Sequence, residues 1–152
     1  METGWTEVTI RGALIDPVTG EPTILLENSD ATSFISVPGD PSSTGALIQE
    51  LEGIGHEPGQ ALLYRFFVRH GVVVERLDLS RSRNGPLGAL LTYRFGGGVF
   101  GMEVRPVDGL IIASQTQSPV YADDRLLASG RSSLPGVADG RDLLILSRRV
   151  DA

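Results

Sequence analysis

Three short stretches at the start of the chain have the apolar pattern of strands. Residues 6–15 place Val8, Ile10 and Leu14 on one side, which is the period of a half-buried strand, and further strands are predicted at 23–27 and 32–37. Segments rich in Asp, Asn, Gly and Pro separate them, and these residues favour turns. The opening of the chain therefore predicts a three-stranded β-meander.

The spacing of apolar residues becomes helical after residue 40. Asp40 is a favourable N-cap residue and Pro41 suits the first helical position, so a helix is expected from there to Gly53. A second helix is predicted over 59–70, with Arg65 and Arg69 on its solvated side. The side chains expected to form its buried stripe are Leu62, Leu63, Phe66, Phe67 and His70.

Alternation returns in the second half of the chain. Residues 72–79, 87–95 and 99–104 predict three consecutive antiparallel strands, with Gly96-Gly97-Gly98 as a hairpin turn between the last two. A third helix, 106–114, is apolar nearly all round and should therefore be central and buried. A short strand at 119–121 and a last short helix capped by Asp123 follow.

These elements predict one α+β domain with a mostly antiparallel sheet over residues 1–130. Its core is expected to include Leu62, Phe66, Leu91, Tyr93, Leu110 and Ile111. Residues 131–152 form a C-terminal extension, in which a segment of loop composition precedes the apolar run Leu143–Leu146.

Composition excludes several classes of protein. The chain has 152 residues and no Cys, which removes disulfide scaffolds, zinc–thiolate sites and thiol nucleophiles. No apolar run is long enough to span a bilayer and no signal peptide is visible, so we expect a cytoplasmic protein without a membrane partner.

Charge is distributed unevenly along the chain. The net charge is −6, and every one of the 13 basic residues is Arg. Six of them lie in segment 65–94 beside only two acidic residues, so this segment carries +4 and the remainder −10. Segment 65–94 either forms a basic face or consists of solvated positions paired with acids elsewhere, and we favour the second interpretation.

Two charged residues flank the start of the third predicted helix. Arg105 and Asp108 could hold an anion at the helix N-terminus, or Asp108 could favour the helix dipole while Arg105 pairs with an acid to fix the junction. The hydroxyls of Ser43 and Thr44 open the first helix, where they could line a pocket or simply serve the helix start. His56 lies in the loop between the first two helices, and no Ser-His-Asp triad can be assembled with confidence.

Four stretches resemble, in order and spacing, the bifunctional nuclease domain family. They are residues 8–26, Leu51-Glu52-Gly53, 71–77 and 105–111, and the match extends over about residues 6–129. The resemblance implies an α+β fold, a homodimer, and nuclease activity on DNA and RNA.

The chain departs from the family pattern at positions that could carry the chemistry. Ser43 stands where the family has a Glu, and Gln60 and Ala61 stand where it has a His-Asp pair, whereas Arg105 and Asp108 are kept. We therefore expect a degenerate site with no metal ligands and no cofactor; Mg²⁺ or Mn²⁺ would be needed only if nuclease activity survives. Within it, the candidate catalytic residues are Arg105 and Asp108, and the candidate ligand-binding residues are Ser43, Thr44, His56, Gln60 and Arg105.

Three functional hypotheses remain open at this point. The first is a metal-dependent nuclease acting on nucleic acid. The second is a diverged protein that uses the same cavity to bind or transform a small anionic or polar molecule. The third is a non-catalytic homodimer that acts through protein interaction.

Overall fold

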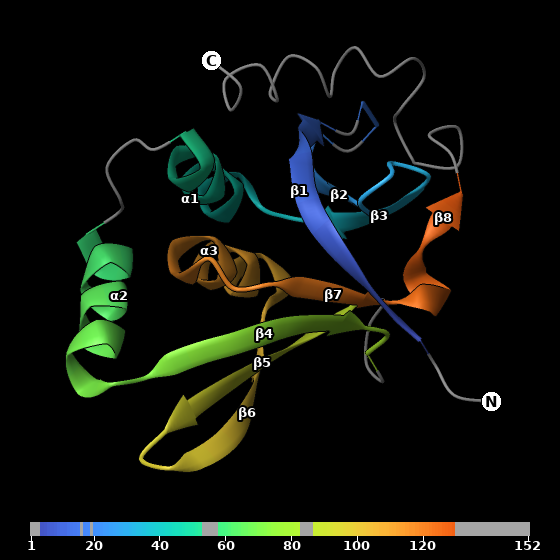
Figure 1. The fold of residues 1–152 in the computed structure, drawn as a ribbon. Helices are drawn as coiled ribbons and strands as arrows, with labels where there is room; N and C mark the ends of the chain where they lie inside the picture. The colour runs from blue at the N-terminus through green and yellow to red at the C-terminus, as the bar shows by residue number, and fades with distance from the viewer. Residues whose placement is uncertain (1–3, 16, 19, 53–57, 83–86, 130–152) are drawn as a thin grey trace.

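The computed structural model describes residues 4–15, 17–18, 20–52, 58–82 and 87–129. They form an α+β domain with a mostly antiparallel sheet, as the sequence predicts (Figure 1). Across the sheet the strands run in the order β6-β5-β4-β7-β1-β2-β3-β8. Their bounds are β1 Trp5–Ile15, β2 Pro22–Glu27, β3 Ser33–Pro38, β4 Val73–Ser80, β5 Gly88–Phe95, β6 Gly98–Val104, β7 Val120–Asp123 and β8 Ala128–Ser129.

Strand β1 joins the two halves of this sheet. Its first residues, Trp5–Val8, pair with β7, and residues from Thr9 onward pair with β2. The register shifts between Ile10 and Gly12, so a bulge bends the strand where it passes from one half to the other. Strand β7 lies between β1 and β4 and pairs with β4 in parallel, which is the one parallel pair recorded among the described strands.

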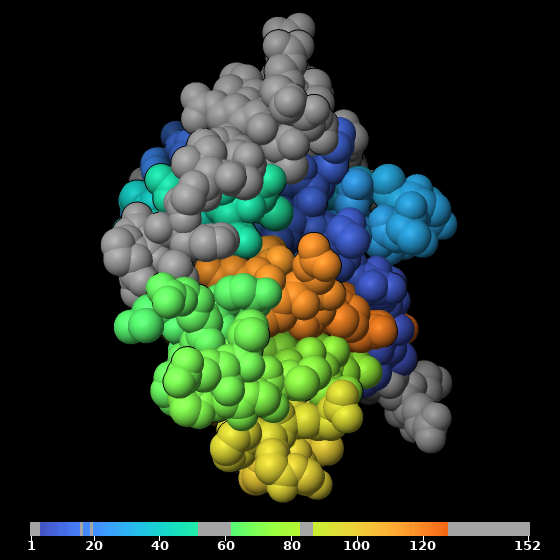
Figure 2. All heavy atoms as spheres, turned by 60° about the vertical axis from the view of Figure 1, so that its left-hand side comes forward, coloured from blue at the N-terminus to red at the C-terminus, as the bar shows by residue number. Residues whose placement is uncertain are grey.

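Three helices pack beside the sheet. They are α1 Pro41–Glu52, α2 Pro58–His70 and α3 Pro106–Thr116. Helix α3 contacts α1, β3, β4 and β5, whereas α2 contacts α3 at the margin of the domain. In Figure 2, α2 lies on the surface next to β4, and the β5–β6 hairpin lies beyond β4.

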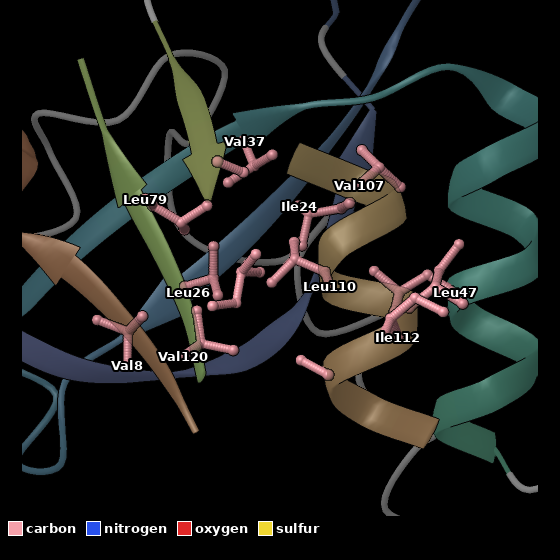
Figure 3. Close-up of a cluster of buried hydrophobic side chains, with 14 of the residues drawn as sticks. Val8, Ile24, Leu26, Val37, Leu47, Leu79, Val107, Leu110, Ile112 and Val120 are labelled. Atoms are coloured by element: carbon pink, nitrogen blue, oxygen red, sulfur yellow. The ribbon is translucent and has the colours of Figure 1, made fainter. Parts of the chain in front are cut away.

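The main core fills the space between α1, α3 and the sheet (Figure 3). Helix α3 is buried along most of its length, which confirms the prediction for segment 106–114. Gly109 allows its close approach to the sheet, because a Cβ there would lie 2.6 Å from Cδ1 of Leu77. Strands β5 and β6 pair as predicted, and Gly96 and Gly97 have the positive φ angles of their tight turn.

The predicted core is correct for α3 and β5 but wrong for α2. Leu91, Leu110 and Ile111 are buried, and Tyr93 is half-buried. Leu62 and Phe66 are instead 65% and 55% exposed. The helix lies beside α3 instead of over the sheet, so its contact with the core runs through Phe67.

The last predicted helix is also shorter than expected. Asp123 does cap it, since its side chain accepts a hydrogen bond from the backbone N–H of Arg125. The helix is one 3₁₀ turn, Asp124–Leu126, and the chain then adds β8 to the edge of β3. The extension at 131–152 lies outside the described residues.

Candidate functional site

The junction between β6 and α3 is built around Arg105. This residue is the N-cap of α3, with φ −66° and ψ 141°, and Pro106 takes the first helical position. Its Nε donates to Oδ2 of Asp108 at 2.7 Å and its Nη2 donates to Oδ1 at 3.1 Å. Both side chains are exposed in this two-point ion pair. The hydrogen bonds to Asp108 raise the pKa of Arg105 above its ordinary value, so the guanidinium stays charged.

The start of α1 lies close to this junction. Asp40 caps α1, because its Oδ1 accepts a hydrogen bond from the backbone N–H of Ser43 at 2.8 Å. This bond is the main cause that lowers the pKa of Asp40, and the charge of Arg105 adds a smaller effect in the same direction. The N-termini of α1 and α3 therefore share one corner of the domain.

Each of these two helix ends is matched by a carboxylate of the chain itself. Asp40 serves α1, and Asp108 lies in the first turn of α3. The favourable interaction of a helix N-terminus with negative charge is thus already provided by the protein. This arrangement stabilises the junction and leaves less positive potential for an external anion.

The structure brings together only some of the candidate residues. Arg105, Asp108 and Ser43 lie at the shared corner. Thr44 is buried at the start of α1, and its hydroxyl has no hydrogen-bond partner among the described residues. His56 lies outside the described residues, and Gln60 is placed as part of the first turn of α2 without a described side chain.

The described residues contain no group of three His, Asp or Glu side chains that could hold a metal ion. Asp108 is the carboxylate that the resemblance keeps in its expected place. Both of its oxygens accept hydrogen bonds from Arg105. A carboxylate used in this way is a poor ligand for a hard cation, which needs several oxygens converging on one point.

A hollow of about 740 Å³ has Arg105 in its wall. It lies where β4 ends, β5 begins and β6 passes into α3. Arg81, Ser80 and Ser82 line it together with Arg105, and Glu103 is the one described acidic residue in its wall. No motif marks residues 80–82 in the sequence, and the positive charge of segment 65–94 is the one pattern that includes them.

Two arginines of the charged segment 65–94 form ion pairs within it. Arg76 pairs with Asp78 at 2.6 Å and also lies 4.0 Å above the ring of Tyr121. Arg94 pairs with Glu75. Two of the six arginines are therefore paired, but with acids of their own segment and not with acids elsewhere in the chain.

Helix α2 and the β5–β6 hairpin expose a group of large apolar side chains, which we call the apolar face. Its members are 42% to 65% exposed, and they are Leu62, Leu63 and Phe66 on α2 and Phe95, Phe100 and Met102 on the hairpin. Figure 2 shows these elements side by side with the start of β4 on one surface of the molecule. Proteins that act alone rarely expose apolar groups of this extent, so such a face commonly marks an interaction site.

Comparison of the sequence with models of known protein families gives no match, and comparison with curated proteins gives none either. Among the described residues, no helix combines the length and the apolar character that crossing a bilayer requires.

Proposed function

We propose that this protein is a self-associating binding domain in which two copies pair through the apolar face. The observation that carries the proposal is the exposure of six large apolar side chains on α2 and the β5–β6 hairpin. Burying apolar surface yields about 25 cal/mol per Å², and an interface of this kind removes several hundred Å² from water on each partner. Two copies of one chain most often pair about a two-fold axis.

The edge of the sheet supports a second copy as the partner. β6 lies at one end of the strand order, so its outer edge has no neighbouring strand among the described residues. Its seven residues include one charged side chain, Glu103, and no Pro, Lys or Arg. Natural proteins usually protect an edge with such residues or cover it, and an unprotected edge favours pairing with another strand.

The two features act together. Phe100 and Met102 lie opposite Tyr93 and Leu91, so they share the face of the hairpin that turns toward the helices. Tyr93 and Phe100 stack with ring centroids 5.7 Å apart, which stiffens that face. In the proposed dimer, β6 of each copy pairs antiparallel with β6 of the other and the apolar faces close over the seam.

Nuclease activity, which the family resemblance implies, receives less support from the geometry. Of the set formed by the family Glu, the His-Asp pair and Asp108, this chain retains Asp108 alone, and that side chain is engaged by Arg105. Cleavage of single-stranded DNA that depends on Mg²⁺ or Mn²⁺, and that disappears in Asp108→Asn, would favour the nuclease hypothesis over the binding domain.

The proposal is tested by the mass of the protein in solution. Light scattering at micromolar concentration should give twice the chain mass of 16.2 kDa. Phe100→Asp places a charge in the seam and should give the monomer mass. Val18→Asp makes the same kind of change at a side chain that is 91% exposed outside the apolar face, and it should leave the dimer intact.

Two results would contradict the proposal. One is a monomer mass for the unmodified protein over the whole micromolar range. The other is equal loss of the dimer in Phe100→Asp and Val18→Asp. Circular dichroism of both variants establishes that each has folded before its mass is compared.

A further inference from the structure

The hollow beside Arg105 has a composition that the self-association does not explain. It lies at the end of the β5–β6 hairpin opposite the Gly96–Gly98 turn, where Gly88–Leu90 face Glu103 and Val104. Its size is that of a site for a small organic molecule. Arg81 and Arg105 do not belong to the apolar face, so variants of these arginines test the hollow separately from the self-association.

Two arginines supply its positive charge. Arg105 uses two of its five N–H groups on Asp108, which leaves three donors on the same guanidinium. Arg81 forms no ion pair or hydrogen bond with any described residue, although its charge contributes to lowering the pKa of Asp123. Asp123 itself is held at two points by Arg125, so Arg81 remains available to another anion.

The remaining wall divides into polar and apolar parts. Ser80 lies beside Arg81 in the wall, and a hydroxyl group beside a guanidinium adds to the hydrogen bonding of a phosphate or carboxylate. Leu87, Leu90 and Pro106 provide apolar surface in the same hollow. A ligand that satisfies both parts has one anionic group and an apolar body.

We infer that this hollow binds a small organic anion, a phosphate monoester or a carboxylate, with its anionic group between Arg81 and Arg105 and its apolar body against Leu87 and Leu90. The carboxylate of Glu103 narrows the class of ligand further. A nucleic acid strand would bring additional phosphates against this carboxylate, and the repulsion disfavours a polyanion relative to a ligand with one anionic group.

The experiment is a titration of the full chain with phenyl phosphate and with benzoate, followed by amide chemical shifts and calorimetry at constant ionic strength. Cyclohexanol serves as the uncharged probe and inorganic phosphate as the anion without an apolar body. Phenyl phosphate or benzoate should bind in the millimolar range or better, with amide shifts at Ser80–Ser82, Val104 and Arg105. The affinity should exceed those of both reference probes.

Arg81→Gln should weaken binding of the better probe by about tenfold, because a charge-assisted two-point contact is lost. Arg69→Gln removes the same charge from an exposed position on α2 and should leave the affinity unchanged. Neither residue belongs to the apolar face, so the mass in solution of each variant is the same as that of the parent.

Three outcomes would overturn the inference. They are the absence of saturable shifts with either organic anion, equal affinities in Arg81→Gln and Arg69→Gln, and tighter binding of a short thymidine oligonucleotide that is lost in Arg81→Gln. The last result would assign the hollow to nucleic acid. A monomeric protein that still binds phenyl phosphate through Arg81 would refute the dimer and leave this site intact.

Discussion

Helices α2 and α3 contain similar proportions of apolar residues but have opposite environments. In α3, Leu110 is fully buried and its neighbours Ile111 and Ile112 pack in the same core. In α2, Leu62 and Phe66 are exposed. The difference lies in what faces each helix: α3 has strands on one side and α1 on the other, whereas α2 has a neighbour along one margin only. An apolar helix therefore indicates that some surface covers it. That surface can belong to the same chain or to another one.

The comparison is tested most strongly by truncating one leucine in each helix. Leu110→Ala should lower the free energy of unfolding by about 2–5 kcal/mol, because a buried leucine leaves a cavity when it is shortened. Leu62→Ala should change it by less than about 0.5 kcal/mol, as exposed positions do. Both are measured by urea denaturation in the Phe100→Asp background, so that dimer formation does not contribute. Equal losses at the two positions would refute the difference between the helices.

Adding a methyl group sharpens the same contrast. Gly109→Ala places a Cβ 2.6 Å from Leu77 and 3.1 Å from Cγ2 of Val104, so the crowded seam of α3 and β4 must open. We expect a loss of about 1–3 kcal/mol. Gly45→Ala on α1 meets nothing within 4 Å and should stabilise the protein by about 0.5–1 kcal/mol through helix propensity. A stabilising Gly109→Ala, measured by urea denaturation, would contradict the close packing of α3.

The pH dependence of stability concerns Asp123, a buried carboxylate at the end of β7. Its hydrogen bond with Arg125, whose Nη2 lies 2.7 Å from Oδ2, is the main cause that lowers its pKa below the ordinary 3.8. A lowered folded-state pKa means that the unfolded chain takes up the proton first. The resulting stability is therefore complete above about pH 4 and is lost as the pH falls through the folded-state pKa.

Asp123→Asn tests this assignment in urea denaturation at a series of pH values. The variant should be less stable at neutral pH and should lose less stability than the parent on acidification. Glu7→Gln, at an exposed carboxylate on β1, should leave the acid dependence as it is in the parent. An unchanged acid dependence in Asp123→Asn would show that other carboxylates control it.

The smallest effect is expected at the first turn of α3, where the buried helix reaches solvent. Arg105 and Asp108 are both exposed, and an exposed ion pair contributes about 0.2–1 kcal/mol. Arg105→Gln and Asp108→Asn should each cost less than about 1 kcal/mol, and the double variant gives their coupling energy. A coupling well above this range would mean that the pair is more important to the junction than its exposure indicates.

Much of the fold could be predicted from local patterns. Alternation in 87–95 and 99–104 specified the hairpin, and the apolar run of 110–113 specified a buried helix, because each pattern depends on neighbours close in sequence. The position of β7 could not be predicted in this way. Four residues at 120–123 give no local signal that they pair in parallel with β4 and antiparallel with β1.

The site was predictable in part for the same reason. Arg105 and Asp108 lie three residues apart at a helix start, so their ion pair follows from local geometry. The approach of Asp40 and Ser43 to that junction depends on how α1 packs against α3, which no spacing reveals. The contribution of Arg81 to the hollow likewise requires the end of β4 to meet the start of α3 in space.

The central place of β7 also constrains how the chain can fold during synthesis. The ribosome completes β1 to β4 first, yet β1 and β4 acquire their common neighbour only when residues 120–123 have emerged. Until then the two halves of the sheet have facing edges without a strand between them, and contacts far apart in sequence form late. We therefore expect this domain to acquire its native structure only after most of the chain has left the exit tunnel, with chaperones that shield exposed strand edges acting in that interval.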